Sequence, residues 1–386
     1  MRFVGTLLFA SLGLLAQDVT KEGSDWVRRQ SASDVAPPQA TKIEVHAQGG
    51  IVVRESNDNR LSYTFTQRIP AGSRTEAQAQ QTLGGGLFRR VLMPNGAVMV
   101  VADGTSSNVS TVLEIQVPKN FNSAALEVRF GGDISIYDFR GNVAAVTGSG
   151  SIRGDRIHGS VNAKSGGGEI RFGTVDGSVE CFTGAGSITI DSAGGRVDCT
   201  TGGGQTNVRQ AGGAVVLHAE GGDISVQRAA GSVDARASSG LIEVGQAGGN
   251  VIAITRGGSI QVGPAHGVRA ESGQGKIHVY GVSGPLSLSA AMGNILAELM
   301  AGAQIQESSF LSRAGDITVS MPSNLAVSVM ATQDSGGNPR IQSDFSELRA
   351  NAIGWQRPPV VVQGAINGGG PVFHLSAPVI YLRKIK

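Results

Sequence analysis

The chain has 386 residues, of which 57 are glycine, 5% are aromatic and 16% are charged, and its formal net charge is +2 at pH 7. So mild a charge, with Lys and Arg scattered along the chain, excludes the electrostatic footprint of a protein that binds nucleic acid or an anionic membrane surface. Two cysteines are too few for a disulfide-stapled scaffold or for the paired clusters of a zinc site. Frequent turns and few large side chains are typical of many short strands.

Residues 1–16 have the pattern of a secretory signal peptide. Arg2 gives a short positive start, an apolar run extends from Phe3 to Leu15, and Ala16 precedes a polar boundary. The run is too short for a helix that spans a bilayer. We therefore expect export to the periplasm, the cell surface or the extracellular medium, with no transmembrane segment in the mature chain. The alternative is a buried N-terminal strand.

The next two segments lack a regular period. Residues 17–40 are polar, end near a pair of prolines and are expected to form a flexible linker. An irregular N-terminal β cap is predicted for 41–111, because short apolar runs alternate there with turn residues at uneven spacing. Within it, 75–83 is rich in helix-forming residues and stops at Gly84, which predicts one short helix.

From 112 to 319 the chain repeats itself. Glycines recur every nine residues from Gly132 to Gly258, and most precede an alternation of polar and apolar residues, as in Gly132-Asp-Ile-Ser-Ile136. A period of two places successive side chains on opposite faces of a strand. Corners with an apolar residue alternate with Gly-rich corners, so the true unit is eighteen residues and two strands. This predicts an all-β fold, a parallel β-solenoid or β-helix of stacked two-strand coils.

The repeat has two interruptions. One residue is missing at His266, and an insertion at 300–310 predicts a protruding loop. The remaining segment, 320–386, is predicted to form C-terminal β coils and a cap.

Corner glycines such as Gly168 and Gly204 are expected to adopt positive φ, which residues with a Cβ disfavour.

Three motifs carry a resemblance to a known family. They are the repeated Gly-Asp-Ile-Ser-Ile/Val phrase, the entry Leu113-Glu-Ile-Gln-Val-Pro118 and the closing Gly364-Ala-Ile-Asn-Gly-Gly-Gly370. Over residues 42–386 the chain resembles the bacterial putative adhesin family, β-helical domains of unknown function related to autotransporter-adhesin heads. The resemblance implies an exported β-helical envelope protein and offers no catalytic residues to carry over.

The corners do not have the composition of a calcium-binding repeat. Nonapeptide repeats that bind calcium also make eighteen-residue coils, through Gly-Gly-x-Gly-x-Asp corners. Here the corners read Lys164-Ser-Gly-Gly, Phe182-Thr-Gly-Ala and Thr200-Thr-Gly-Gly, without the ordered aspartates. The six histidines are scattered and form no His-x-x-x-His pair. No metal, cofactor or catalytic residue is therefore predicted.

One pair of carboxylates and one pair of cysteines recur at equivalent positions of successive coils. Glu180 and Asp198 would lie about 5 Å apart, the separation that a retaining glycosidase uses. Arg196 shares their face and neutralises them, so we interpret the three residues as a solvated surface cluster. Cys181 and Cys199 occupy inward positions, where stacking allows either a disulfide or two buried thiols.

The sequence favours a non-enzymatic exported envelope or surface protein, an adhesin-like scaffold that presents polar faces to a glycan or protein partner. Two alternatives stay open, a polysaccharide-acting β-helix enzyme and a purely structural spacer. The short coil and the lack of clustered Asp, Lys and Arg beside a loop-walled cleft argue against the enzyme. Nucleic acid is not expected as a partner.

Overall fold

The computed structural model describes residues 15–16, 18–104, 108–333, 340–348 and 360–385. Residues 1–14, which hold most of the predicted signal peptide, lie outside the described part of the chain. The chain divides into two compact units, Met1–Gly186 and Ser187–Lys386. Within the described residues, no helix is long and apolar enough to cross a membrane.

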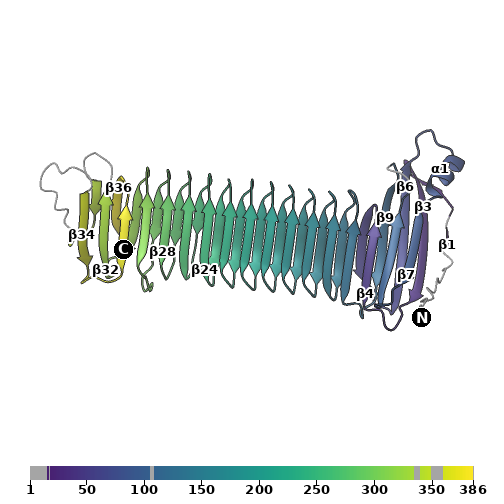
Figure 1. Ribbon diagram of the computed structural model, residues 1–386, viewed down its shortest axis with the longest axis horizontal. Helices are drawn as coiled ribbons and strands as arrows, with labels where there is room; N and C mark the ends of the chain where they lie inside the picture. The colour runs from purple at the N-terminus through teal and green to yellow at the C-terminus, as the bar shows by residue number, and fades with distance from the viewer. Residues whose placement is uncertain (1–14, 17, 105–107, 334–339, 349–359, 386) are drawn as a thin grey trace, which may run out of the picture. The chain divides into compact units, whose positions relative to one another are not determined.

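The first unit contains parallel coils of the predicted kind (Figure 1). Each coil has one strand in each of two sheets. One sheet contains β8 (Ala97–Asp103), β4 (Lys42–Ala47), β10 (Ser123–Val128), β12 (Asn142–Thr147), β14 (Val161–Ser165) and β16 (Val179–Thr183). The other contains β9 (Ser110–Val117), β5 (Gly50–Glu55), β11 (Ile134–Phe139), β13 (Ile152–Ile157) and β15 (Ile170–Val175). Ile134 pairs with Ile152, eighteen residues on, which confirms the predicted period.

The core of each coil is the row of inward side chains that the alternation predicts. In β11 the burial alternates, with Ile134 and Ile136 fully buried and Ser135 between them partly exposed. A fully buried aliphatic side chain stabilises a fold by roughly 1.5–3 kcal/mol. Stability is therefore spread over many small, similar contributions from successive coils.

The coils of the first unit are not stacked in chain order. β4 lies between β8 and β10, and β5 lies between β9 and β11. After the β4–β5 coil the chain forms β6 (Arg60–Pro70), α1 (Glu76–Leu83) and β7 (Leu87–Leu92). It then forms β8 and β9, which lie on the side of the β4–β5 coil opposite to β10 and β11. β6 and β7 then pair antiparallel with β9 and β8, which ends the parallel stack at this side.

The predicted short helix is present as α1. Thr75 caps it with a capping box, in which its hydroxyl accepts from the backbone N–H of Gln78 and the Gln78 side chain accepts from the backbone N–H of Thr75. Ala79 and Leu83 are the buried residues of the helix, and they pack with Ile69 of β6. α1 therefore covers the end of β6 (Figure 1).

Within residues 18–40, where the sequence analysis expected a flexible linker, the structure has two strands. β2 (Thr20–Glu22) and β3 (Asp25–Val35) pair antiparallel, and β3 also pairs with β6 along its whole length. The segment is polar because β3 is half-exposed, and ion pairs such as Arg90–Asp34, at 2.6 Å, hold its charged side chains.

The second unit has the same two-sheet architecture. One sheet contains β17 (Ile188–Ala193), β19 (Thr206–Ala211), β21 (Ile224–Ala229), β23 (Ile242–Ala247), β25 (Ile260–Val262), β27 (Ile277–Tyr280), β29 (Ile295–Glu298), β31 (Ile317–Pro322), β36 (Val379–Ile385) and β33 (Arg340–Ser343). The other contains β18 (Val197–Thr201), β20 (Val215–Ala219), β22 (Val233–Ala237), β24 (Asn250–Thr255), β26 (Gly267–Ser272), β28 (Leu286–Ala290), β30 (Ser308–Ser312), β35 (Val372–Ser376), β32 (Val327–Gln333) and β34 (Val360–Ile366).

The predicted interruptions are found in the second unit. Ile260 pairs with Ile277, so this coil is one residue shorter than the others. β29 ends at Glu298, and β30 begins at Ser308. The insertion connects the two strands, and Met300 is exposed within it. The last coil, β35 and β36, again lies out of chain order, between β30–β31 and β32–β33.

The corner glycines are required for a different reason from the one predicted. Gly168 and Gly204 are not in the left-handed region, so the predicted positive φ is wrong for them. A Cβ on Gly168 would instead lie 2.1 Å from the carbonyl oxygen of Gly150, and one on Gly150 would lie 2.0 Å from that of Gly132. The stacked corners approach so closely that no side chain fits between them.

Buried hydroxyl groups tie these corners together, a feature that the sequence analysis missed. Ser165 donates to the carbonyl of Gly150 at 2.9 Å and accepts from the backbone N–H of Gly168 at 2.8 Å. Ser272 and Ser312 make the same two contacts in the second unit. The sequence signal is a Ser or Thr three residues before the corner glycine, since the hydroxyl satisfies backbone groups that the turn leaves unpaired.

Candidate functional site

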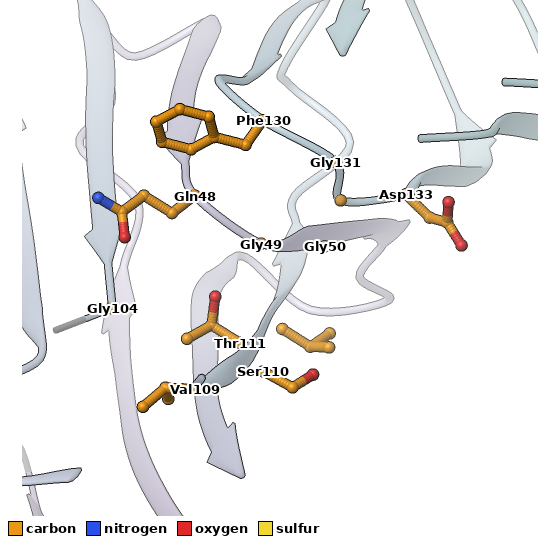
Figure 2. A pocket seen from close by; sticks show the side chains of 12 residues that line it. Gln48, Gly49, Gly50, Gly104, Val109, Ser110, Thr111, Phe130, Gly131 and Asp133 are labelled. Atoms are coloured by element: carbon orange, nitrogen blue, oxygen red, sulfur yellow. The ribbon is translucent and has the colours of Figure 1, made fainter. Parts of the chain in front are cut away.

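A hollow of about 730 Å³ interrupts the corners of the first unit (Figure 2). It is lined by Gln48, Gly49, Gly50, Gly104, Val109, Ser110, Thr111, Val112, Phe130, Gly131, Gly132 and Asp133. These residues come from the ends of β4, β8 and β10 and from the starts of β5, β9 and β11. Three coils that lie side by side therefore contribute to one site.

The corner at the centre of the hollow is shorter than the next one. Only Gln48 and Gly49 connect β4 to β5, whereas 129–133 connect β10 to β11. Gly49 itself packs closely, because a Cβ there would lie 2.1 Å from the Thr111 carbonyl oxygen, and one on Gly132 would lie 2.6 Å from the Gly49 carbonyl oxygen. The hollow therefore lies beside closely stacked backbone, where connections of unequal length meet.

The lining combines one aromatic ring with several polar groups. Phe130 is 67% exposed, the largest exposed fraction among the large hydrophobic side chains of the described residues. Figure 2 shows its ring on the same side of Gly49 as Gly131, and the Ser110 and Thr111 side chains on the other side. Ser110 is exposed and Thr111 is 6% exposed.

Asp133 is held by the next coil. Its Oδ1 accepts from the backbone N–H and from the hydroxyl of Ser151, each at 2.8 Å. The Gln48 side-chain amide, in contrast, has no hydrogen-bond partner among the described residues. The carboxylate is thus turned toward the next coil, and the site offers an amide that both donates and accepts, and an exposed ring.

A second hollow, of about 400 Å³, lies on an outward face of the second unit. Arg269, Ser287, Ser309 and His374 lie there on neighbouring strands in direct register. His374 Nε2 lies 3.1 Å from the Glu307 carboxylate, and Arg269 pairs with Glu271 at 2.6 Å. Arg269 and His374 of this row are therefore each already in contact with a carboxylate.

The predicted surface cluster divides between the two units. Arg196 and Asp198 belong to the second unit and form an ion pair at 2.9 Å. Glu180 belongs to the first unit, where its carboxylate accepts from the Asn162 side chain at 2.9 Å. The Arg196–Asp198 contact agrees with the interpretation of these residues as solvated charges, and the three-residue cluster stays a prediction.

Cys181 and Cys199 are both buried, at inward positions of β16 and β18. They also belong to different units. The choice between a disulfide and two buried thiols stays a prediction.

Several ionisable side chains on the outward faces contact one another across coils. His46–Glu127, at 2.9 Å, and His158–Asp176, at 2.7 Å, join neighbouring coils of the first unit. Arg156 donates to Asp138, also eighteen residues away, and this hydrogen bond lowers the pKa of the Asp138 carboxyl. Across the residues that the structure describes, no three His, Cys, Asp or Glu side chains gather as metal ligands.

Comparisons with known proteins found similarity to solved structures alone. No family model and no curated protein matches the sequence. A solved structure from Clostridium sporogenes, a "putative cell adhesion protein", is similar at 8% identity, over 92% of this chain and 100% of that one, with a TM-score of 0.19. A "putative adhesin" from Bacteroides fragilis is similar at 15% identity, over 76% of this chain and 96% of that one, with a TM-score of 0.19.

Proposed function

We propose that this chain is an exported, non-catalytic scaffold of the adhesin type, which binds a glycan or protein partner of the cell envelope. The observation that carries the proposal is the register of its outward polar side chains. In the first unit Ser135, Arg153 and Arg171 follow one another on adjacent strands. Parallel strands hold such rows about 4.8 Å apart, a spacing at which a partner can contact several coils at once.

The chemistry of these faces supports binding more than catalysis. The ionisable side chains pair with one another across coils, as Arg153 does with Glu169 at 3.2 Å. A hydrolase needs a nucleophile, a base and an orienting group that converge on one point. Glu180 and Asp198, the carboxylates that the sequence analysis weighed for such a role, contact Asn162 and Arg196.

Export is tested by fractionation of cells that express the chain with and without residues 1–16. We expect the full chain outside the cytoplasm and the shortened chain inside it.

Binding is tested with the purified chain on arrays of envelope glycans and surface proteins. Saturable binding to either class supports the scaffold. Turnover of a polysaccharide would contradict the non-catalytic assignment, and silence on both arrays would favour a structural spacer.

A further inference from the structure

We propose that the hollow around Gln48, Ser110 and Phe130 binds neutral sugar residues of a glycan. This inference rests on the proposed function and specifies its partner. The volume of about 730 Å³ falls in the range of small-molecule sites, roughly 300–1,000 Å³. The hollow is therefore large enough for a short oligosaccharide end.

Phe130 provides the apolar contact. Its ring is 67% exposed, so it is not needed to fill the core, and the neighbouring inward residue Val128 is buried. An exposed ring beside a concave polar surface marks a binding site. A pyranose ring has one face made of C–H groups, which packs on an aromatic face while its hydroxyl groups point away.

Gln48 and Ser110 provide the polar contacts. The amide of Gln48 has a donor and an acceptor without partners among the described residues, and Ser110 presents a hydroxyl on the other side of the short corner. Sugar hydroxyl groups both donate and accept, which suits an amide and a hydroxyl better than a single charged group would. The bare backbone of Gly49 and Gly50 allows the ligand to approach closely.

The charges of the lining favour a neutral ligand. Among the described residues that line the hollow only Asp133 is charged, and its carboxylate is turned to the next coil, where it accepts two hydrogen bonds from Ser151 (Figure 2). The described lining has no Arg or Lys that could pair with the carboxylate of a uronic or sialic acid, so that charge would lose its hydration without gaining a counter-charge. The site should therefore select neutral sugars.

The experiment measures binding of the full chain to an array of neutral and acidic oligosaccharides, followed by calorimetry with the best neutral one. Phe130→Ala removes the stacking ring, and Ser110→Trp fills the hollow from an exposed position. We expect each to weaken binding at least tenfold, and Gln48→Ala to weaken it severalfold. Phe182→Ala is the matched control, because Phe182 is also exposed, at 49%, and does not line the hollow.

Each outcome bears on the site and on the scaffold separately. The site is supported if the unmodified chain binds neutral sugars, the Phe130 and Ser110 variants lose this binding, and both variants unfold at the same temperature as the unmodified chain. Sugar binding that both variants keep overturns the site and leaves the scaffold in place. Binding only to acidic sugars, or only to an envelope protein, overturns the neutral-sugar site alone. An absence of binding to either class overturns both proposals.

Discussion

The regular coils and the corner around Gly49 share close packing and differ in the lengths of their connections. In the regular coils the corners have equal lengths, and each glycine faces the carbonyl of the one before it, as Gly168 faces Gly150. Around Gly49 the coils are stacked out of chain order and their corners differ in length, while Gly49 still packs on the Thr111 carbonyl. The hollow lies where the connections are unequal. From this comparison we infer that stacking provides stability and that unequal connections provide the site.

The sharpest test of the close stacking adds a side chain to two glycines of different surroundings. Gly168→Val should destabilise the fold by about 3 kcal/mol or more, because its Cβ would lie 2.1 Å from the Gly150 carbonyl oxygen. Gly50→Ala, one residue past the closely packed Gly49 and beside the hollow, should change stability by less than about 1 kcal/mol, since the nearest atom to its Cβ would be 3.4 Å away. Chemical denaturation measures both. Equal effects would contradict the claim that the stacked carbonyl is what makes a corner glycine necessary.

The buried corner hydroxyls test what holds regular corners together. Ser165→Ala leaves the Gly150 carbonyl and the Gly168 N–H without their side-chain partner, so we expect a loss of about 1–3 kcal/mol in the free energy of unfolding. Ser135→Ala, on the outward face of β11, is the control and should cost little. A Ser165 variant as stable as that control would mean that the hydroxyl contributes nothing.

Thr206 is a defect in the regular core that a substitution should repair. It lies in register between Ile188 and Ile224, is 1% exposed, and its hydroxyl has no partner among the described residues. Thr206→Val keeps the shape and removes the unpaired group, so stability should rise by about 1 kcal/mol. Thr189→Val, at an outward position, should not raise it. A fall in the melting temperature of the Thr206 variant would show that its hydroxyl is satisfied.

The smallest expected effect concerns the outward ion pairs. The hydrogen bond from Arg156 lowers the pKa of Asp138 below its value in the unfolded chain, about 3.9. A carboxyl whose folded pKa is depressed stabilises the fold above the unfolded pKa, and this contribution disappears as the pH falls through the folded pKa. Because both side chains are about half exposed, it should be below about 1 kcal/mol. In Asp138→Asn the free energy of unfolding should fall less steeply below about pH 4 than in the unmodified chain. An unchanged pH dependence in this range would contradict the assignment to Asp138.

The coil and its register could be predicted from the sequence because they depend on local periodicity. The eighteen-residue spacing of Ile134 and Ile152 and the short helix at Glu76–Leu83 are examples. The order of the coils could not be predicted, because the alternation of buried and exposed residues in β4 does not say which strands lie beside it. β3 was missed because a half-exposed strand tolerates a polar sequence.

The hollow was missed for the same reason as the coil order. The connection at Gln48 and Gly49 is visibly short in the sequence, yet its length matters only beside the connections at 104–109 and 129–133. Those segments become neighbours only through the pairing of β4 with β8 and β10. The corner hydroxyls, in contrast, follow a local spacing and could have been found.

The most direct test of the central claim measures stability and binding in one variant. For Phe130→Ala we predict an unfolding free energy within about 0.5 kcal/mol of the unmodified chain, since the ring is exposed, together with at least tenfold weaker binding of a neutral oligosaccharide. Intact binding, or a loss of stability comparable to that of Gly168→Val, would contradict the separation of a stabilising repeat from a binding interruption.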